Sequence, residues 1–235
     1  MDAIILAAGL GQRLRPYTMT NPKPLLPVQG RPILDWILAA LPPVVDRTLV
    51  VVNYLAEQIE GYLASQFYQT QWLTVRQKSP KGTGDALRSC RNLVRSDRFL
   101  VLNGDDLYGA ADLANATKFP AAILVSPVDQ PRQFGIVFPR ADGTLDRLVE
   151  KPDLEGRHLA NIGAYLFPRE ALAFEPPLSP RGEYEITDYV SWVAQRTPVQ
   201  VVTTSFWYPV GTVDAWHRAD QVDLTPCRPL DARST

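Results

Sequence analysis

The sequence contains few of the residues that redox and metal chemistry use, with two cysteines, two histidines and two methionines among 235 residues. Cys90 lies in a predicted helix and Cys227 near the C-terminus, and their spacing resembles no C-x-x-C site, so we expect a buried apolar thiol and an incidental one. His158 and His217 are isolated, without the surroundings of a catalytic triad or a zinc site. The cysteines and histidines of the sequence therefore support neither a hydrolytic triad nor a zinc centre.

A basic excess and long apolar runs are also missing. Lys and Arg number 24 against 25 Asp and Glu, whereas nucleic-acid binders normally carry a basic surface. The apolar stretch from Ile4 to Ala8 falls far short of the ~20 residues that cross a bilayer, and no charged leader precedes it. We therefore expect a cytoplasmic protein with no nucleic-acid and no membrane partner, which holds any phosphate at a local site.

What the sequence does contain is a glycine-rich turn after its first apolar stretch, Gly9-Leu10-Gly11-Gln12-Arg13, followed by Pro22-Lys23-Pro24. Glycines at a strand end let backbone N–H groups turn toward an anion, and Arg13 and Lys23 would add positive charge. The turn lacks both the P-loop pattern and the third glycine of the dinucleotide fingerprint. The two cations favour a polyphosphate site over a simple tight connection.

These segments, Leu-Ala-Ala-Gly-x-Gly-x-Arg-Leu at residues 6–14 and Pro-Lys-Pro-Leu at 22–25, resemble the N-terminal signature of the sugar-1-phosphate nucleotidyltransferases, or NDP-sugar pyrophosphorylases. Single-domain thymidylyl- and uridylyltransferases for glucose 1-phosphate are the members it resembles. The resemblance implies an α/β fold of the nucleotide-diphospho-sugar transferase type, a Rossmann-like three-layer sandwich with a mostly parallel mixed sheet. It also implies that Leu6, Ala8, Gly9 and Gly11 contact the nucleotide.

The hydrophobic pattern agrees with that fold, because strand-like apolar runs alternate with amphipathic stretches. The pattern predicts strands at 2–8, 48–53, 73–77, 99–102, 121–126, 135–139, 145–150 and 160–167, and helices at 32–41, 56–67, 84–94, 111–116, 184–195 and 213–221. We expect one domain over residues 1–223, with a nucleotide-binding half at 1–128, a sugar-phosphate-binding half at 129–223 and a loose tail at 224–235. The six-residue repeats of the acyltransferase domain that some relatives carry are not present.

Gln77 and Gly82-Thr83 stand at a strand end, a turn and a helix start. Thr83 as an N-cap and a glycine for the turn would explain the segment by structure alone. By resemblance, Gln77, Gly82 and Thr83 lie against the nucleobase. A Gln amide offers a donor and an acceptor together, as a pyrimidine edge requires.

A carboxylate pair, Asp105-Asp106, follows another apolar run. Ligands of open α/β sheets bind at the carboxyl ends of strands, and Mg²⁺ held by one or two carboxylates and phosphate oxygens would offset the charge of a triphosphate. A solvated acidic turn is the alternative. The resemblance makes Asp105 the metal ligand and puts Asp106 behind it or in solvent.

Three later motifs resemble the sugar-binding segments of the family: Phe134-Gly135, Glu150-Lys151-Pro152 and Asn161-Ile162-Gly163. They imply that the Gly135 amide, Glu150 and Asn161 contact hydroxyl groups of the sugar and that Lys151 meets the sugar phosphate. Glu150-Lys151 alone could be an exposed ion pair of little value. The segment 182–188 also matches, but its acidic residues suit a first helical turn, and we expect it to be structural.

One motif departs from the family pattern. Many relatives have Trp-x-Asp-x-Gly-Thr, whose Asp is the second metal ligand, where this chain has Trp207-Tyr208-Pro209-Val210-Gly211-Thr212. The Pro209 side chain cannot bind a metal. Either Mg²⁺ rests on Asp105, phosphates and water, or Asp214 or a backbone carbonyl substitutes, or the enzyme is weak.

The implied reaction is attack by a sugar 1-phosphate oxygen on the α-phosphorus of a nucleoside triphosphate, a transfer that rests on positioning and charge neutralisation. Arg13 would hold the leaving phosphates, Lys23 and Mg²⁺ on Asp105 the α-phosphoryl oxygens, and Lys151 the nucleophile. UTP or dTTP with a hexose 1-phosphate is favoured. Mannose 1-phosphate with GTP, an amino-sugar 1-phosphate with UTP, an alcohol phosphate with CTP, and a non-catalytic nucleotide-sugar sensor stay as alternatives, and assembly into a homo-oligomer stays open.

Overall fold

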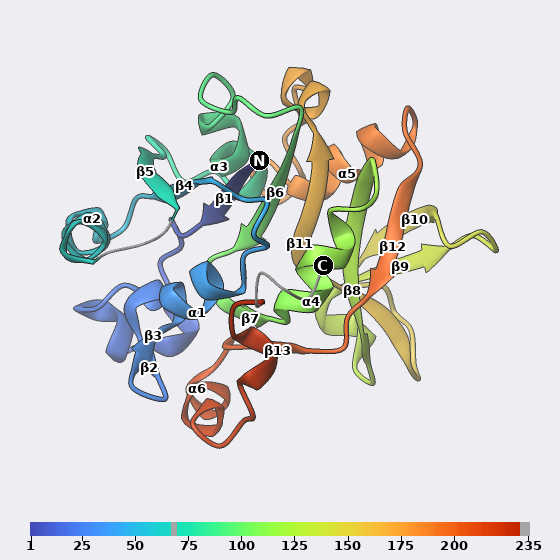
Figure 1. Ribbon diagram of the computed structural model, residues 1–235. Helices are drawn as coiled ribbons and strands as arrows, with labels where there is room; N and C mark the ends of the chain where they lie inside the picture. The colour runs from blue at the N-terminus through green and yellow to red at the C-terminus, as the bar shows by residue number, and fades with distance from the viewer. Residues whose placement is uncertain (67–69, 231–235) are drawn as a thin grey trace.

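A computed structural model describes residues 1–66 and 70–230. The described residues form a nine-stranded mixed sheet with the strand order β10-β9-β11-β6-β1-β4-β5, in which β8 also pairs with β11 and β12 with β8 (Figure 1). Its strands are β1 (Asp2–Leu6), β4 (Arg47–Val52), β5 (Gln71–Arg76), β6 (Arg98–Asn103), β8 (Ala121–Val128), β9 (Gly135–Pro139), β10 (Leu145–Glu150), β11 (His158–Pro168) and β12 (Val199–Thr203).

The first strand shows how the sheet divides the core into two layers. β1 runs parallel to both of its neighbours, so that Ile4 stands opposite Leu49 and Val101. Successive side chains of a strand point to opposite faces, and accordingly Ile5 packs into one hydrophobic cluster and Ile4 into the other. A strand buried on both faces must be apolar throughout, which explains the continuous apolar run of the sequence.

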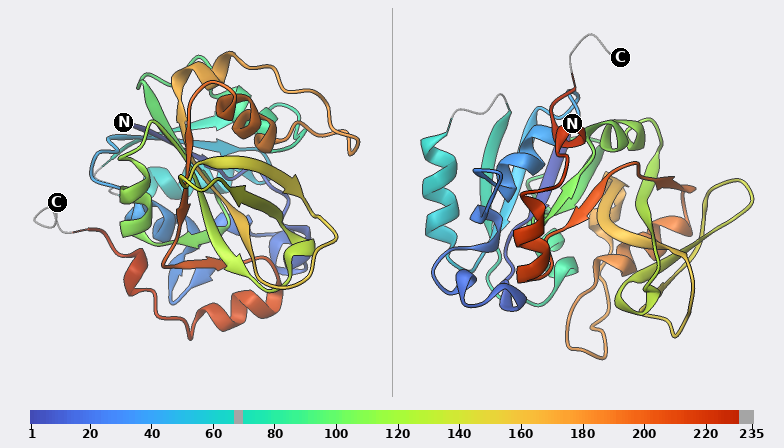
Figure 2. Two further views of the ribbon diagram at one scale, coloured as in Figure 1. Left: turned by 90° about the vertical axis from the view of Figure 1, so that its right-hand side faces the viewer. Right: turned by 90° about the horizontal axis from the view of Figure 1, so that it is seen from below.

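Helices cover both faces, which confirms the predicted three-layer arrangement. α1 (Ile33–Ala40), α2 (Ala56–Ser65) and α4 (Ala110–Ala116) contribute buried residues to one cluster, and α3 (Thr83–Ser89) and α5 (Ile186–Ala194) to the other. α6 (Val213–Ala219) extends the first layer near the short pair β2 (Pro27–Val28) and β3 (Arg31–Pro32). Figures 1 and 2 show α2 at one end of the sheet and the β9–β10 pair at the other.

β11 joins the two halves of the sheet. Its C-terminal part pairs antiparallel with β6, with Ala164 opposite Leu102, and its N-terminal part pairs with β9, while β8 pairs with both parts. The β8 register shifts between Asn161 and Tyr165, an irregularity of the β-bulge kind, which locally re-aims a side chain. The Asn161-Ile162-Gly163 motif is therefore the bulged part of a central strand.

The structure corrects several sequence expectations. Pro32 is extended and ends β3, so α1 begins at Ile33 and not at the proline. The strand β12 and the short pair β7 (Asp106–Tyr108) with β13 (Trp207–Pro209) were not predicted. The predicted helix 56–67 ends at Ser65, and residue 67 lies outside the described residues.

The segment expected to be a loose tail from residue 224 packs into the core over its first residues. Leu224 and Cys227 are buried in the same cluster as α1 and α4, and a 3-10 turn spans Thr225–Cys227. Cys227 is thus a core residue and not an incidental thiol, and burial raises its pKa to about 12. Residues 231–235 lie outside the described part of the chain.

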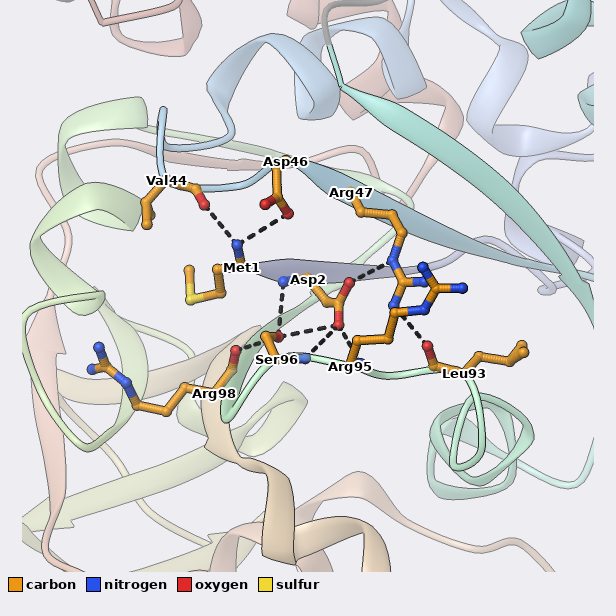
Figure 3. Close-up of polar contacts among 9 residues, drawn as sticks. All are labelled: Met1, Asp2, Val44, Asp46, Arg47, Leu93, Arg95, Ser96 and Arg98. Atoms are coloured by element: carbon orange, nitrogen blue, oxygen red, sulfur yellow. Dashed lines mark hydrogen bonds and ion pairs between the residues drawn. The ribbon is translucent and has the colours of Figure 1, made fainter.

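A buried carboxylate, Asp2, anchors the N-terminal start of β1 (Figure 3). Its oxygens accept hydrogen bonds from Arg47 Nε at 2.7 Å, from the backbone N–H groups of Arg95 and Ser96, and from Ser96 Oγ. Burial raises the pKa of Asp2, but these donors outweigh it and lower the pKa to about 2. The network ties β1 to β4 and to the segment before β6.

Within residues 1–66 and 70–230, no helix has both the length and the apolar character that crossing a membrane requires.

Candidate functional site

A cavity of about 800 Å³ opens at the carboxyl ends of β1 and β6. This is the edge of an α/β sheet at which ligands bind. Its lining unites segments far apart in the sequence. It includes all of the residues expected to bind nucleotide or phosphate: Leu6, Ala8, Gly9, Gly11, Arg13, Lys23, Gln77, Gly82, Thr83, Asp105 and Lys151. Gly135, Glu150 and Asn161 are not part of this lining.

The glycine-rich turn forms one wall of the cavity. Gly11 adopts a left-handed conformation with φ +61°, and a Cβ there would lie 2.9 Å from Thr18 Cγ2, so this position requires glycine. Thr18 Oγ1 donates a hydrogen bond to the Gly11 carbonyl at 2.8 Å and fixes the turn. Arg13 is exposed, and Leu14 beside it is buried and anchors the segment.

Lys23 and Asp105 form an ion pair on the adjoining wall. Lys23 begins a 3-10 turn, Lys23–Leu25, and is almost fully buried. Its Nζ lies 2.6 Å from Oδ2 of Asp105, which lies two residues beyond the end of β6. The Asp105 side chain keeps 38% of its surface exposed, so it remains open to the cavity.

Asp106 turns away from the cavity and is buried in β7. Trp207 Nε1 donates a hydrogen bond to its Oδ2 at 3.1 Å, and the β7–β13 pairing sets Pro209 directly opposite it. Burial, followed by the nearby charge of Asp105, raises the pKa of Asp106 above its ordinary value, against the opposing effect of Lys23. This placement agrees with the expectation that Asp105, and not Asp106, faces the ligand.

A divalent cation would therefore find a single strand-end carboxylate here. Among the described residues, no group of three His, Cys, Asp or Glu side chains could enclose a metal. Asp214, considered as a substitute ligand, is an exposed residue of α6 outside the cavity lining. Asp105 with phosphate oxygens and water, with or without a backbone carbonyl, still fits Mg²⁺, which commonly uses one or two carboxylates plus substrate phosphates.

Gln77 lines the same cavity as the glycine-rich turn. It directly follows β5 and is buried, and its Nε2 donates hydrogen bonds to Asp85 Oδ2 at 2.8 Å and to the Gly82 carbonyl at 3.2 Å. Gly82 has φ +96°, and a Cβ there would lie 2.5 Å from the Tyr184 carbonyl oxygen. Only glycine fits this turn.

The segment before α5 docks on this turn through its backbone. Tyr184 accepts a hydrogen bond from the Gly84 N–H at 2.8 Å and donates one to the Lys81 carbonyl at 2.7 Å. Thr83 is the first residue of α3 and not its N-cap, and its hydroxyl oxygen accepts a hydrogen bond from the Ile186 N–H. The docking agrees with a structural role for residues 182–188. It also brings Glu183 and Glu185 into the cavity lining, which the sequence did not predict.

The three residues expected to contact the sugar gather in one cluster beyond the cavity lining. A Cβ on Gly135 would lie 3.0 Å from Glu150 Oε2 and 3.8 Å from Asn161 Cβ. Asn161 donates a hydrogen bond to the Tyr165 hydroxyl at 2.7 Å and accepts one from the Gly163 N–H. Lys151, next to Glu150, has φ +43° and reaches the cavity itself. It therefore connects the cluster to the cavity.

Comparisons with known proteins agree with this arrangement. The profile of the family described as "Nucleotidyl transferase" matches residues 2–225. The glucose-1-phosphate thymidylyltransferase of Streptomyces griseus is 30% identical over 241 residues, which cover 97% of this chain and 68% of that protein. The bifunctional protein GlmU of Methanocaldococcus jannaschii is 35% identical over 214 residues, covering 90% of this chain and 51% of the relative. The chain thus spans about half the length of the GlmU proteins it matches.

Solved structures are similar over nearly the whole chain. A Bacillus anthracis structure described as a candidate glucose-1-phosphate thymidylyltransferase, in complex with a sucrose, has a TM-score of 0.81 at 28% identity and covers 94% of each chain. A UDP-glucose pyrophosphorylase complexed with UDP-glucose also has a TM-score of 0.81, at 23% identity, with 94% of this chain covered. The second similarity concerns the fold alone.

Proposed function

Because this chain belongs to the nucleotidyl transferase family, we propose that it transfers a nucleotidyl group from a nucleoside triphosphate to a sugar 1-phosphate, giving an NDP-sugar and pyrophosphate. The observation that carries the proposal is the convergence of Arg13, Lys23, Asp105 and Lys151 on one cavity with the Gln77 amide. These five groups come from five separate segments, and together they suit a nucleoside triphosphate and a second phosphorylated substrate.

In the proposed step, an oxygen of the sugar phosphate forms a bond to the α-phosphorus, and the bond from the α-phosphorus to the bridging oxygen of the β-phosphate breaks. Pyrophosphate leaves with that electron pair. The nucleophile is already an anion, so no general base is needed. Holding the two phosphates in line and neutralising their charge is then the main task of the protein.

We assign the residues as follows. Arg13 and the N–H groups of residues 9–11 hold the β- and γ-phosphates, and the buried Lys23 meets the α-phosphoryl oxygens. Lys151 positions the incoming sugar phosphate, and the cluster of Gly135, Glu150 and Asn161 binds sugar hydroxyls. Residues 1–128 thus form the nucleotide half and residues 129–223 the sugar-phosphate half. Each substrate would occupy its own half, and the reacting phosphates would meet between them.

Mg²⁺ bound through Asp105 would supply further positive charge to the triphosphate when present. The partly exposed Asp105 carboxylate beside Lys23 supports this assignment. With Pro209 in place of a second carboxylate, the two cations Arg13 and Lys23 carry more of the neutralisation. We expect turnover to depend on Mg²⁺.

UTP or dTTP with a glucose-type 1-phosphate are the substrates we favour. The Gln77 amide suits a pyrimidine edge, and the names of two similar proteins refer to thymidylyl transfer to glucose 1-phosphate. The Glu150 and Asn161 side chains favour a sugar over an alcohol phosphate. The cytoplasmic location and a homo-oligomeric state remain predictions.

Pyrophosphate release across a panel of nucleoside triphosphates and sugar 1-phosphates, with and without Mg²⁺, tests the proposal. We expect turnover with at least one pair of substrates and its loss in Arg13→Ala and Lys23→Ala. Nucleotide binding by calorimetry with no pyrophosphate release from any pair would instead indicate a sensor. Full turnover in either alanine variant would contradict the assigned phosphate contacts.

A further inference from the structure

The Gln77 side-chain amide is held in one orientation by its protein partners. Both of its N–H bonds are used, one by Asp85 Oδ2 at 2.8 Å and one by the Gly82 carbonyl at 3.2 Å. A carboxylate and a carbonyl accept hydrogen bonds and donate none. Rotating the amide by half a turn would place its oxygen against two acceptors. The nitrogen therefore points into the protein.

Asp85 is itself fixed as an acceptor. It lies buried in the first turn of α3, and its second oxygen, Oδ1, accepts a hydrogen bond from Arg88 Nη2 at 2.7 Å. Arg88 in turn lies 3.7 Å from Glu175 and stacks on the Tyr184 ring, with 4.8 Å between its guanidinium carbon and the ring centroid. Each carboxylate oxygen of Asp85 thus has its own donor.

The orientation leaves Oε1 of Gln77 for the cavity. In the described part of the chain no side chain or backbone group donates a hydrogen bond to Oε1, and this atom is not among the buried unpaired ones. The neighbouring Gly82 N–H likewise has no acceptor among the described residues. Both residues line the cavity, and we take this acceptor and this donor as the pair that the edge of a bound base would meet.

Nucleobases fall into two classes against such a pair. Uracil, thymine and guanine present a ring N–H donor next to a carbonyl acceptor, whereas cytosine and adenine present a ring nitrogen acceptor next to an amino donor. Against the fixed pair of Oε1 and N–H, the first class makes two hydrogen bonds. A base of the second class would set its ring nitrogen, an acceptor, against Oε1 and its amino group, a donor, against the N–H.

We propose that Asp85 is a positioning residue that makes the base site selective for keto bases, by holding Gln77 with its carbonyl oxygen toward the nucleotide. The inference rests on the proposed function and deepens it, because it admits UTP, dTTP and GTP and rejects CTP and ATP. Asp85 does not touch the nucleotide. It acts through the orientation of one amide.

Calorimetric binding of UTP and CTP to the full chain, alongside turnover with each, tests this inference. The unmodified protein should bind UTP about 100-fold more tightly than CTP, because two unpaired polar groups would otherwise be buried. In Asp85→Asn the new amide can donate as well as accept, so Gln77 can rotate. The ratio of UTP affinity to CTP affinity should then fall at least tenfold.

Glu175→Gln is the matched control, because Glu175 pairs with Arg88 and Arg91 in the same network without contacting Gln77. It should keep the UTP-to-CTP ratio. An unchanged UTP-to-CTP affinity ratio in Asp85→Asn would overturn the role of Asp85. So would a fall of this ratio in Glu175→Gln as large as the fall in Asp85→Asn. Should Asp85→Asn not fold, the unmodified protein decides: equal affinity for UTP and CTP overturns the inference.

The two proposals fail in different ways. Selective UTP binding without pyrophosphate release from any sugar phosphate would contradict the proposed reaction and still support the base selectivity. Turnover with CTP as efficient as with UTP would support the reaction and contradict the selectivity.

Discussion

Lys23 Nζ and Asp105 Oδ2 lie 2.6 Å apart although 82 positions separate the two residues in the chain. The 3-10 turn that carries Lys23 and the end of β6 meet at the wall of the cavity. A cation at Asp105 and a phosphate at Lys23 must each compete with this ion pair. Binding of a metal–nucleotide complex would therefore replace one internal contact by two new ones.

Asp105→Asn should lower kcat/KM for pyrophosphate release by about 100-fold or more, because a metal ion at a transferring phosphoryl group contributes several kcal/mol. The measurement is the initial rate as a function of Mg²⁺ concentration. Asp214→Asn, which alters an exposed carboxylate of α6 outside the cavity lining, is the control and should leave the rate unchanged. Equal losses in both variants would contradict a specific role for Asp105.

Lys23→Met should reduce the free energy of unfolding as well as activity. The change leaves Asp105 without its partner, and since Asp105 is partly exposed we expect a cost of about 1–3 kcal/mol, below that of a fully buried pair. The double variant Lys23→Met/Asp105→Asn removes both charges and should recover most of this loss while remaining inactive. Urea unfolding of Lys23→Met, Asp105→Asn and the double variant measures the coupling free energy between the two side chains. A double variant no more stable than Lys23→Met would refute this coupling.

Asp2 should make stability depend on acid pH. Its pKa is about 2 in the folded protein, against 3.8 for the free side chain, so its contribution is complete above about pH 4 and is lost as the pH falls through 2. The difference corresponds to about 2.5 kcal/mol at neutral pH. Asp2→Asn should lose about that amount at pH 7 and progressively less toward pH 2. Denaturant unfolding between pH 2 and 7 checks this, with Asp46→Asn at the same end of the sheet as an exposed control (Figure 3).

Leu224→Ala should destabilise the protein by about 2–4 kcal/mol, as expected for a leucine buried in a core. Leu178→Ala makes the same chemical change at a side chain that is 55% exposed, and should cost less than about 0.5 kcal/mol. Thermal or urea unfolding compares the two. A similar, small effect in both would show that the segment after residue 223 does not support the core.

The sequence predicted the long central strands because burial on both faces demands unbroken apolar runs, as in β1, β4 and β6. It missed β7 and β13, which have three residues each and no room for a hydrophobic period. β12 has a β-branched run, Val-Gln-Val-Val-Thr, that could have been recognised. Leu224 and Cys227 are single apolar residues among prolines, and only the tertiary fold shows that they are buried.

The candidate site was predictable where chemistry follows a local motif, as with the Gly9-x-Gly11 turn, Gln77 and Asp105, all of which reach the cavity. It was not predictable where distant backbone contacts bring a side chain in. Glu183 and Glu185 line the cavity because the neighbouring Tyr184 bonds to the backbone at Lys81 and Gly84. The pairing of Gln77 with Asp85 also depends on how the turn between β5 and α3 folds back.

β11 has a consequence for how members of this family can diverge. One continuous strand runs alongside β6, which ends next to Asp105, and also carries Asn161 beside β8 and β9. The distance between the two proposed binding regions is therefore set by the hydrogen-bonded register of this strand and not by a hinge or linker. Exchange of one half between relatives would have to cut through this shared strand, whereas altered loops leave the spacing intact. In the proposed site, a new sugar specificity would then arise from side-chain changes at strand positions such as Gly135, Glu150 and Asn161, with the spacing of the two regions unchanged.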